Sequence, residues 1–394
     1  MSVPAASVRE RNLAALALRQ PELAEWLRGR SDDPVASNPS TPPGGRAGSA
    51  TGELEGRAWA FSRGASTLVL VFGADALLRD SPCDAALGPA LAVVVERQEA
   101  RLREVLRSVD LAPSLEKGQL ALVLAGNELE LVEALKPLVP LVLPSDGPAI
   151  VMSSGLSEEE AQEYGRWGDE ARRFIELSRD PTILNIELYQ RFKPVADRIN
   201  ALAERGLSVL DVGGREWAFS AFLPGHRVVV ADLETTGIDA RALPYGDDSF
   251  DVVTSHHLLE HVPAPDRLRV VAELVRVARR WVFLTGPFEE NRFAREIDEL
   301  LVRLEPNNPY LREHAKLGLP SLGEIESWLK GQRYRYRVEP LTRCNIWLLA
   351  LALTPFQQVR PREFREVTRY YNQRFSEFDR VHPAYQTLIE IEVR

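Results

Sequence analysis

Short runs of apolar residues, each followed by a segment with helical spacing, form the main pattern in the first half of the chain. The runs lie at 66–72, 91–96 and 119–124, and the helical segments lie at 97–109 and 128–135. A continuous apolar run is typical of a strand that is buried on both faces, and alternation with helices is typical of a parallel sheet. Residues 58–150 are therefore predicted to form a small α/β domain.

The segment ahead of this domain has a different pattern. Residues 1–30 have leucines near helical spacing, so they predict an N-terminal amphipathic helix that Pro21 kinks or divides. Residues 31–57 are rich in Ser, Pro and Gly and contain almost no large apolar side chain. That composition cannot form a core and is typical of a linker.

Helical spacing continues after the first domain. Ser157 and Glu160 have the spacing of a capping box, which predicts a helix that begins there. A second predicted helix ends near Arg205 and includes Pro194. Residues 151–205 are interpreted as a helical connector, and both helices are expected to pack on the domain that follows.

From residue 206 onward, strands and helices alternate again. Apolar runs predict strands at 207–212, 227–232, 250–255 and 281–285, with a helix at 266–279. Two later segments, 334–340 and 385–393, alternate between apolar and polar residues, which predicts an antiparallel pair of strands. Residues 206–394 therefore predict a second, larger α/β domain.

Composition limits the kinds of partner. The chain has 394 residues and a formal net charge of −9, so it lacks the basic character that phosphate binding favours, and no nucleic-acid partner is predicted. Its two cysteines, Cys83 and Cys344, are far apart, which suits a reducing, cytoplasmic location. We see no apolar signal segment, and the longest apolar run, 346–353, is too short for a membrane span and predicts a buried helix.

The first strand of the second domain leads into the residues that are most informative about function. Asp211 lies near its end, and Gly213 and Gly214 follow, so the backbone can approach a ligand closely at the carboxyl edge of the sheet. The next strand ends at Asp232, where a carboxylate can accept hydrogen bonds from both hydroxyl groups of a ribose. Asp239 lies in a loop, where it can accept a hydrogen bond from an adenine amino group.

These residues belong to a longer pattern: VLDVGG, VVVADL, IDARALPYGDDSFDVVTSHHLLEHV and LVRVARRWVFLTGPF. It resembles bacterial class I S-adenosylmethionine-dependent methyltransferases over about residues 205–290. The resemblance implies an α/β fold with a seven-stranded Rossmann-like sheet, and S-adenosyl-L-methionine as the cofactor. It also implies methyl transfer to a small molecule, or to a saccharide or lipid precursor of the cell surface.

The resemblance assigns the adenosine half of the cofactor to four residues, two at the end of the second strand and two in the loop that follows. Asp232 would bind the ribose, and Leu233 would pack on the adenine ring. Asp239 and Ala240 would hold the adenine edge.

The methionine half is assigned to the first and third strand ends of the pattern. Asp211, Gly213 and Gly214 would form the loop under the methionine part. Ser255 and His256 would flank the sulfonium and its methyl group.

One departure from the family pattern affects this loop. The family usually has Asp-x-Gly-x-Gly-x-Gly, whereas Arg215 and Trp217 occupy the second and third glycine positions here. Bulky side chains there can narrow or close the cofactor site. The alternative hypothesis is therefore a non-catalytic scaffold, or a partner subunit of a glycan-modifying enzyme.

The histidines of the HHLLEH segment have more than one interpretation. His257 and His261 are four residues apart and would share a helix face, but the order is not H-E-x-x-H and no third ligand is evident, so no metal site is predicted. His261 is expected to pack and hydrogen-bond near the cofactor. His257 faces the predicted substrate side and is the candidate general base, with a structural histidine as an equal alternative.

Residues 287–330 follow the last parallel strand, and the resemblance implies that their helices cover the substrate pocket. Four basic residues there are candidates for contact with an anionic acceptor: Arg292, Arg295, Arg312 and His314. The alternative is a solvated helical face on which these residues pair with neighbouring carboxylates.

The first domain has only one glycine after its first strand, and its second strand ends at Glu96, where a ribose-binding acid would lie. Together with the segment 12–26, it resembles the Rossmann-like domain of bacterial motility-associated glycosyltransferases. Because the glycine motif is eroded, we interpret it as a degenerate domain that is structural or forms a homodimer. A glycosyltransferase that uses residues 1–150 is a third hypothesis.

Overall fold

The computed structural model describes most of the chain: residues 7–28, 68–74, 91–117, 119–139, 149–153, 155–203, 205–214, 217–304 and 307–393. The predicted linker, 31–57, lies outside the described residues. The chain divides into two compact units, residues 1–178 (unit 1) and 179–394 (unit 2).

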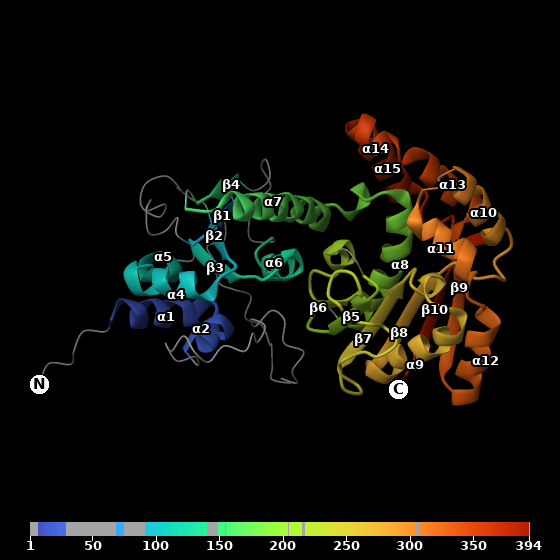
Figure 1. Cartoon of the computed structure of the whole chain (residues 1–394), viewed down its shortest axis with the longest axis horizontal. Helices are drawn as coiled ribbons and strands as arrows, with labels where there is room; N and C mark the ends of the chain where they lie inside the picture. Colours follow the sequence, from blue (N-terminus) through green and yellow to red (C-terminus); the bar gives the residue numbers. More distant parts are fainter. Residues whose placement is uncertain are drawn as a thin grey trace, which may run out of the picture. The chain divides into compact units, whose positions relative to one another are not determined.

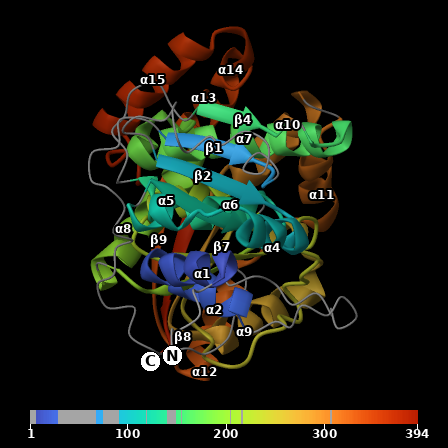
Figure 2. The same ribbon diagram turned by 90° about the vertical axis from the view of Figure 1, so that its left-hand side faces the viewer.

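Unit 1 contains a four-stranded parallel sheet (Figure 2). Its strands are β1 (Leu68–Phe72), β2 (Leu91–Glu96), β3 (Leu120–Leu124) and β4 (Ala149–Met152), in the order β3-β2-β1-β4. The three predicted strands are confirmed. β4 was not predicted, because it has only four residues and lies at the edge of the predicted domain.

The helices that the structure describes in unit 1 are α1 (Val8–Arg19), α2 (Pro21–Arg28), α4 (Glu99–Ser108), α5 (Ala112–Glu116), α6 (Glu128–Leu135) and α7 (Glu158–Arg179). Pro21 begins α2, so it divides the predicted N-terminal helix in two. The Asn12 side chain donates to the carbonyls of Leu106 and Val109 at 2.9 and 2.7 Å. α1 is thereby joined to α4, over a core that the sheet shares.

The two helices of the predicted connector belong to different units. α7 begins at the predicted capping box, where Ser157 and Glu160 bond reciprocally. The Tyr164 ring of α7 lies 5.3 Å from that of Phe72 on β1. α7 was expected to pack on the second domain; the structure shows its apolar face on the sheet of unit 1, to which it belongs. The second helix, α8 (Ile186–Leu202), belongs to unit 2.

Unit 2 contains a six-stranded sheet in the order β6-β5-β7-β8-β10-β9 (Figure 1). Its strands are β5 (Ser208–Val212), β6 (Arg227–Ala231), β7 (Phe250–His256), β8 (Ala278–Gly286), β9 (Arg335–Arg343) and β10 (Ala384–Glu392). β5 to β8 are parallel, and β10 pairs antiparallel with both β8 and β9. The mixed α/β class and the antiparallel tail pair are confirmed.

The implied count of seven strands is not met among the described residues. The segment between β6 and β7 turns back on itself, because the Ile238 N–H donates to the Asp232 carbonyl at 3.1 Å. It therefore does not extend along the free edge of β6.

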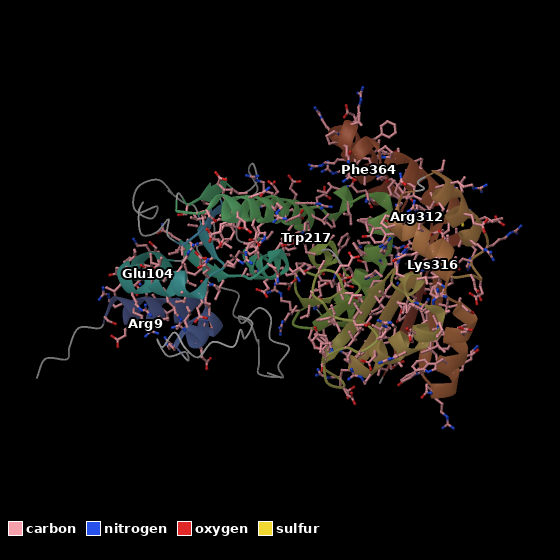
Figure 3. The ribbon with its side chains drawn as sticks, in the orientation of Figure 1. Arg9, Glu104, Trp217, Arg312, Lys316 and Phe364 are labelled. Carbon is pink, nitrogen blue, oxygen red and sulfur yellow. The ribbon has the colours of Figure 1, made fainter. Side chains whose placement is uncertain are left out.

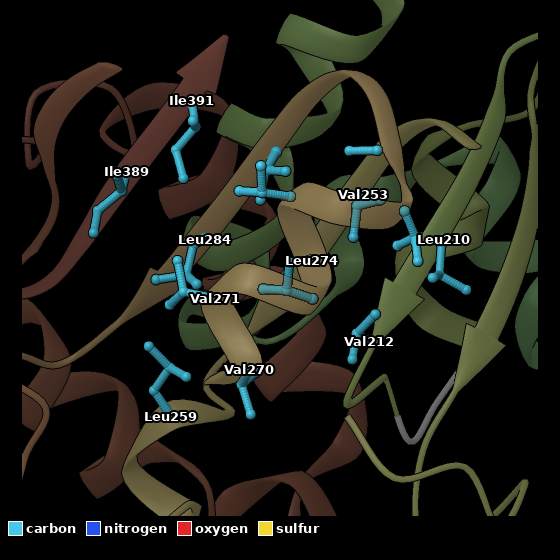
Figure 4. Close-up of a cluster of buried hydrophobic side chains, with 14 of the residues drawn as sticks. Leu210, Val212, Val253, Leu259, Val270, Val271, Leu274, Leu284, Ile389 and Ile391 are labelled. Atoms are coloured by element: carbon cyan, nitrogen blue, oxygen red, sulfur yellow. The ribbon is translucent and has the colours of Figure 1, made fainter. Parts of the chain in front are cut away.

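The remaining helices of unit 2 surround this sheet. They are α9 (Arg267–Val277), α10 (Ala294–Leu304), α11 (Pro309–Leu317), α12 (Leu322–Gln332), α13 (Cys344–Leu353), α14 (Phe356–Val359) and α15 (Pro361–Arg374). Val270, Val271 and Leu274 of α9 are fully buried and pack toward Leu210 and Val253 of the sheet (Figure 4). Within the described part of the chain, no helix is both long and apolar enough to cross a bilayer.

Candidate functional site

A cavity of about 660 Å³ lies in unit 2 at the carboxyl ends of β5, β6 and β7. The chain order reverses at β5, which has β6 on one side and β7 on the other, and ligands of open parallel sheets bind at such a point. Its other walls come from α8, α10, α11, α13 and the start of β10. The volume is in the range of about 300–1,000 Å³ that is typical of ligand pockets.

The loop after β5 forms one wall, and its two glycines are required by the geometry. Gly213 has a φ of +78°, a left-handed conformation that side chains disfavour. A Cβ on Gly214 would lie 2.2 Å from Oδ2 of Asp211, which is closer than any packed contact. Both predicted glycines and Asp211 line the cavity.

Asp211 is 2% exposed and accepts a hydrogen bond from the Thr254 hydroxyl at 2.9 Å. Burial raises the pKa of Asp211 to about 7, and the Thr254 bond and the charge of Arg191 only partly oppose this effect. The carboxyl group thus changes its charge near neutral pH.

Asp232 follows β6 and lines the cavity, as predicted. Its Oδ1 accepts from the backbone N–H groups of Glu234 and Thr235 at 3.0 and 2.9 Å, which fixes the carboxylate in a tight turn. Oδ2 takes part in neither bond. A carboxylate held in this way is suited to accept hydrogen bonds from a ligand.

Leu233, Asp239 and Ala240 also lie on the cavity wall. The Leu233 side chain is 63% exposed, so its surface is open to a ring in the cavity. Both carboxylate oxygens of Asp239 accept from the guanidinium of Arg241 at 2.7 to 3.0 Å. That hydrogen bonding lowers the pKa of Asp239, so the group is ionised and already partnered. Its predicted contact with adenine stays a prediction.

The two residues predicted to flank the sulfonium point to different places. His256 lines the cavity, and its ring contacts those of Phe192 and Phe219 at 5.1 and 4.6 Å. Burial lowers the pKa of His256 well below its usual value, so the ring is neutral. Ser255 is 1% exposed and is not part of the cavity wall, because successive residues of β7 face opposite sides of the sheet.

His257 lies on the cavity wall beside buried aromatic rings. Its ring stacks on that of Trp347 at 5.6 Å, and the Trp347 and Tyr385 rings stack at 4.1 Å. Nδ1 lies 3.0 Å from Oε1 of Glu260, and Nε2 is buried without a partner among the described residues. Burial lowers the pKa of His257, so its ring is neutral at pH 7 and can accept a proton.

His261 and His314 also line the cavity and lie close together, although they are far apart in sequence. Their Nε2 atoms are 3.4 Å apart. Nδ1 of His261 lies 2.8 Å from Oε2 of Glu313, and Nδ1 of His314 lies 3.1 Å from Oδ2 of Asp298. Burial disfavours the charged form of His314, but the Asp298 bond and the Glu260 charge outweigh it and raise its pKa.

The helix-face argument that was used for the histidine segment is wrong. Leu259–His261 forms a short 3-10 helix, and His257 precedes it with a φ of +54°, so His257 and His261 do not share an α-helical face. The third group that the sequence did not reveal is His314 on α11. Its candidate role was contact with an acceptor, and no spacing rule relates it to residues 257–261.

Arg191 on α8 is a cavity residue that the sequence analysis missed. It pairs with Glu187, and its Nε is buried without a partner among the described residues. Arg292, Arg295 and Arg312 are not on the cavity wall. Arg295 forms an exposed ion pair with Glu299, as the alternative interpretation of that segment proposed.

Trp217 is the bulky residue of the cofactor loop that the structure describes. Arg215 lies outside the described residues. Trp217 begins a 3-10 helix, Trp217–Phe222, in which it is 5% exposed, and it is not part of the cavity wall (Figure 3). Trp217 therefore does not fill the cavity.

Residues 218–283 match the family model of a methyltransferase domain. The match runs from the 3-10 helix after β5 to β8. This match confirms the methyltransferase resemblance of the C-terminal region. No curated protein matches the chain.

Several solved structures are similar to half of the chain or somewhat more. YcgJ from Bacillus subtilis shares 17% identity, with 51% of this chain and 98% of that chain covered and a TM-score of 0.31. Magnesium protoporphyrin IX methyltransferase from Synechocystis, solved with bound S-adenosylhomocysteine, shares 12% sequence identity. The alignment covers 59% of this chain and 94% of that chain, with a TM-score of 0.32. A possible histamine N-methyltransferase from Thermotoga maritima shares 15% sequence identity. The alignment covers 60% of this chain and 98% of that chain, with a TM-score of 0.32.

Unit 1 uses its candidate ribose-binding acid for its own backbone. Glu96 is fully buried, and its oxygens accept from the N–H groups of Ala74, Arg97 and Gln98, each at 2.8 Å. Glu96 therefore has a structural role at this strand end. The resemblance of unit 1 to glycosyltransferases stays a prediction.

Proposed function

We propose that unit 2 binds S-adenosylmethionine in the 660 Å³ cavity and transfers its methyl group to a small molecule, or to a saccharide or lipid precursor. The observation that carries the proposal is the loop after β5. Gly213 and Gly214 bring the backbone to the cavity beside Asp211, and Asp232 lies at the next strand end. The family match over 218–283 supports the same conclusion.

Each part of the cofactor has a matching group on the wall. Asp232 would accept from the ribose hydroxyls through Oδ2, and the open surface of Leu233 would cover the adenine. The unpartnered Nε of Arg191 is suited to the methionine carboxylate. A charge-assisted pair there would also offset the burial of that guanidinium.

Methyl transfer from a sulfonium requires little acid–base chemistry, because the leaving group is neutral. The protein mainly aligns the acceptor atom with the methyl group and excludes water. If the acceptor is a hydroxyl, the neutral ring of His257 would take its proton at Nε2 while Glu260 faces Nδ1. We propose that α10 and α11 cover the acceptor, since Leu301, Tyr310 and Leu311 line the cavity.

The alternative, a non-catalytic scaffold, was motivated by Arg215 and Trp217. Trp217 is buried away from the cavity, so it gives no support to the hypothesis that the cofactor site is closed. A homodimer through unit 1 and a cytoplasmic location remain predictions from the sequence.

The proposal is tested by the stabilisation that S-adenosylhomocysteine confers on three proteins. At 100 times its dissociation constant, a ligand stabilises the fold by about 2.7 kcal/mol, which raises the melting temperature of the wild type. Asp232→Ala should lose most of that rise. Glu366→Ala, which removes an exposed carboxylate on α15, should keep it. Equal shifts in all three proteins would remove the ribose assignment, and no shift in the wild type would favour the scaffold.

A further inference from the structure

The pair His261 and His314 on the cavity wall has a hydrogen-bonding problem that the proposed methyl transfer does not explain. Glu313 faces Nδ1 of His261, and Asp298 faces Nδ1 of His314. A carboxylate only accepts hydrogen bonds, so both Nδ1 atoms carry the ring proton. In the neutral rings, the two Nε2 atoms then face each other with lone pairs at 3.4 Å.

A third electron-pair donor points to the same place. Glu260 is 1% exposed; its Oε1 lies 3.0 Å from Nδ1 of His257, and its Oε2 has no hydrogen-bond partner among the residues that the structure describes. Three possible ligand atoms lie within 4.8 Å of one another: one carboxylate oxygen of Glu260, one ring nitrogen of His261 and one ring nitrogen of His314. A buried carboxylate that has one oxygen without a partner is costly unless a cation compensates it. A proton shared between the two rings would satisfy the rings but not this carboxylate.

We propose that Glu260, His261 and His314 bind one divalent cation of the zinc class, with a fourth coordination position open to the cavity. Two histidines and one glutamate are a ligand set that zinc takes in sites with an open position. Zn–N bonds of about 2.0–2.1 Å at a tetrahedral angle place the two nitrogens about 3.4 Å apart. The Nε2 atoms have that separation.

The surroundings of the cluster match those of metal-binding histidines. Such histidines donate their second ring N–H to a carboxylate, which fixes the tautomer and the ring orientation. Glu313 and Asp298 occupy these positions, and Asp298 is itself held by the Tyr385 hydroxyl at 2.5 Å. The site departs from the sequence-based expectation of no metal, because that expectation lacked His314.

The open position gives the cation a place beside a bound acceptor. His261 and His314 both line the cavity, so a ligand atom in the cavity can reach an ion that they hold. Cation binding itself does not depend on the proposed methyl transfer, and its test contains no S-adenosylmethionine.

The test measures zinc and cobalt(II) binding by the full-length chain after chelator treatment. Once zinc is added back, the wild type should bind one zinc per chain. The cobalt form should have the visible absorption of a four-coordinate ion. His314→Gln should lose the ion or bind it at least about tenfold more weakly. Glu313→Gln changes a half-exposed side chain that does not contact the ion, so it leaves folding unaffected, and it should weaken binding by about 10- to 100-fold.

His382→Gln is the matched control, because His382 is exposed and is not part of the cluster. It should bind zinc like the wild type. The proposal is overturned if the wild type binds no zinc, if the cobalt form is six-coordinate, or if the His314 and Glu313 variants bind as tightly as the wild type. Loss of zinc in the His382 variant would assign the ion to the protein surface instead.

Discussion

Arg267, the first residue of α9, joins two turns that form the histidine side of the cavity, so its replacement tests how that wall is built. It is 7% exposed. Nε donates to the carbonyls of Leu259 and Val262 at 3.1 and 3.0 Å. Nη1 and Nη2 donate to the three carbonyls of residues 317–319 at 2.5 to 3.0 Å. The guanidinium therefore fixes the end of α11, which carries His314, against the turn that carries His261.

Arg267→Met removes all five bonds while it keeps much of the side-chain volume. A buried carbonyl that loses its donor costs about 1–3 kcal/mol. The bonds to Leu259 and Val262 are buried, whereas water can reach the carbonyls of 317–319. We therefore expect the variant to lose about 3–4 kcal/mol of the free energy of unfolding of unit 2. Arg267→Lys keeps the charge but cannot reach both turns at once, so we expect about half that loss.

The assay is native-state hydrogen exchange in the presence of a chelator, because it reports the stability of α9 and α11 separately from that of unit 1. Arg269→Met, an exposed change on the same helix, should stay within about 0.5 kcal/mol of the wild type. A loss below about 1 kcal/mol in Arg267→Met, or an equal loss in the Arg269 variant, would refute the reasoning.

Three further predictions concern the strand ends. Gly214→Ala places a Cβ 2.2 Å from Oδ2 of Asp211, and overpacking of this kind costs about 1–3 kcal/mol. Calorimetry should therefore show that the variant binds S-adenosylhomocysteine at least about tenfold more weakly than the wild type. Unchanged affinity would mean that the loop moves to accommodate the methyl group without cost. Asp211→Asn should change the pH dependence of stability. Because burial raises the pKa of Asp211 to about 7, the folded protein keeps a proton that the unfolded chain releases above about pH 4. The stability of the wild type relative to Asp211→Asn should therefore fall between about pH 4 and 7, by up to about 4 kcal/mol, and parallel denaturation curves would contradict this. Glu96→Ala leaves three backbone N–H groups of unit 1 without their acceptor, which should lower the stability of that unit by about 3 kcal/mol in urea unfolding; a neutral effect would reopen a ligand-binding role for Glu96.

The alternation of apolar runs predicted most strands of both units, because a strand buried on both faces must be apolar throughout. The strand ends then place Asp211 and Asp232 on one edge, where the structure has the cavity. The pattern could not predict two segments. β4 has only four residues, and the segment after β6 forms a turn in which the Ile238 N–H bonds to the Asp232 carbonyl.

The candidate site shows the same limit at the level of side chains. Periodicity assumed a helix through His257 and His261, but the chain there takes a left-handed residue and a 3-10 turn. His314 lies beside His261 because tertiary contacts, those of Arg267 among them, hold two distant turns together. Contacts of this kind depend on tertiary packing, and no local spacing encodes them.

Calorimetric titration of the wild-type chain with S-adenosylhomocysteine tests the central claim most directly. The account predicts one binding site per chain with a dissociation constant in the micromolar range, because the glycine loop, Asp232 and Leu233 already form one wall of the cavity. Folded protein that releases no heat of binding at millimolar ligand would contradict the account. The cavity would then serve another ligand, and the scaffold hypothesis would take precedence.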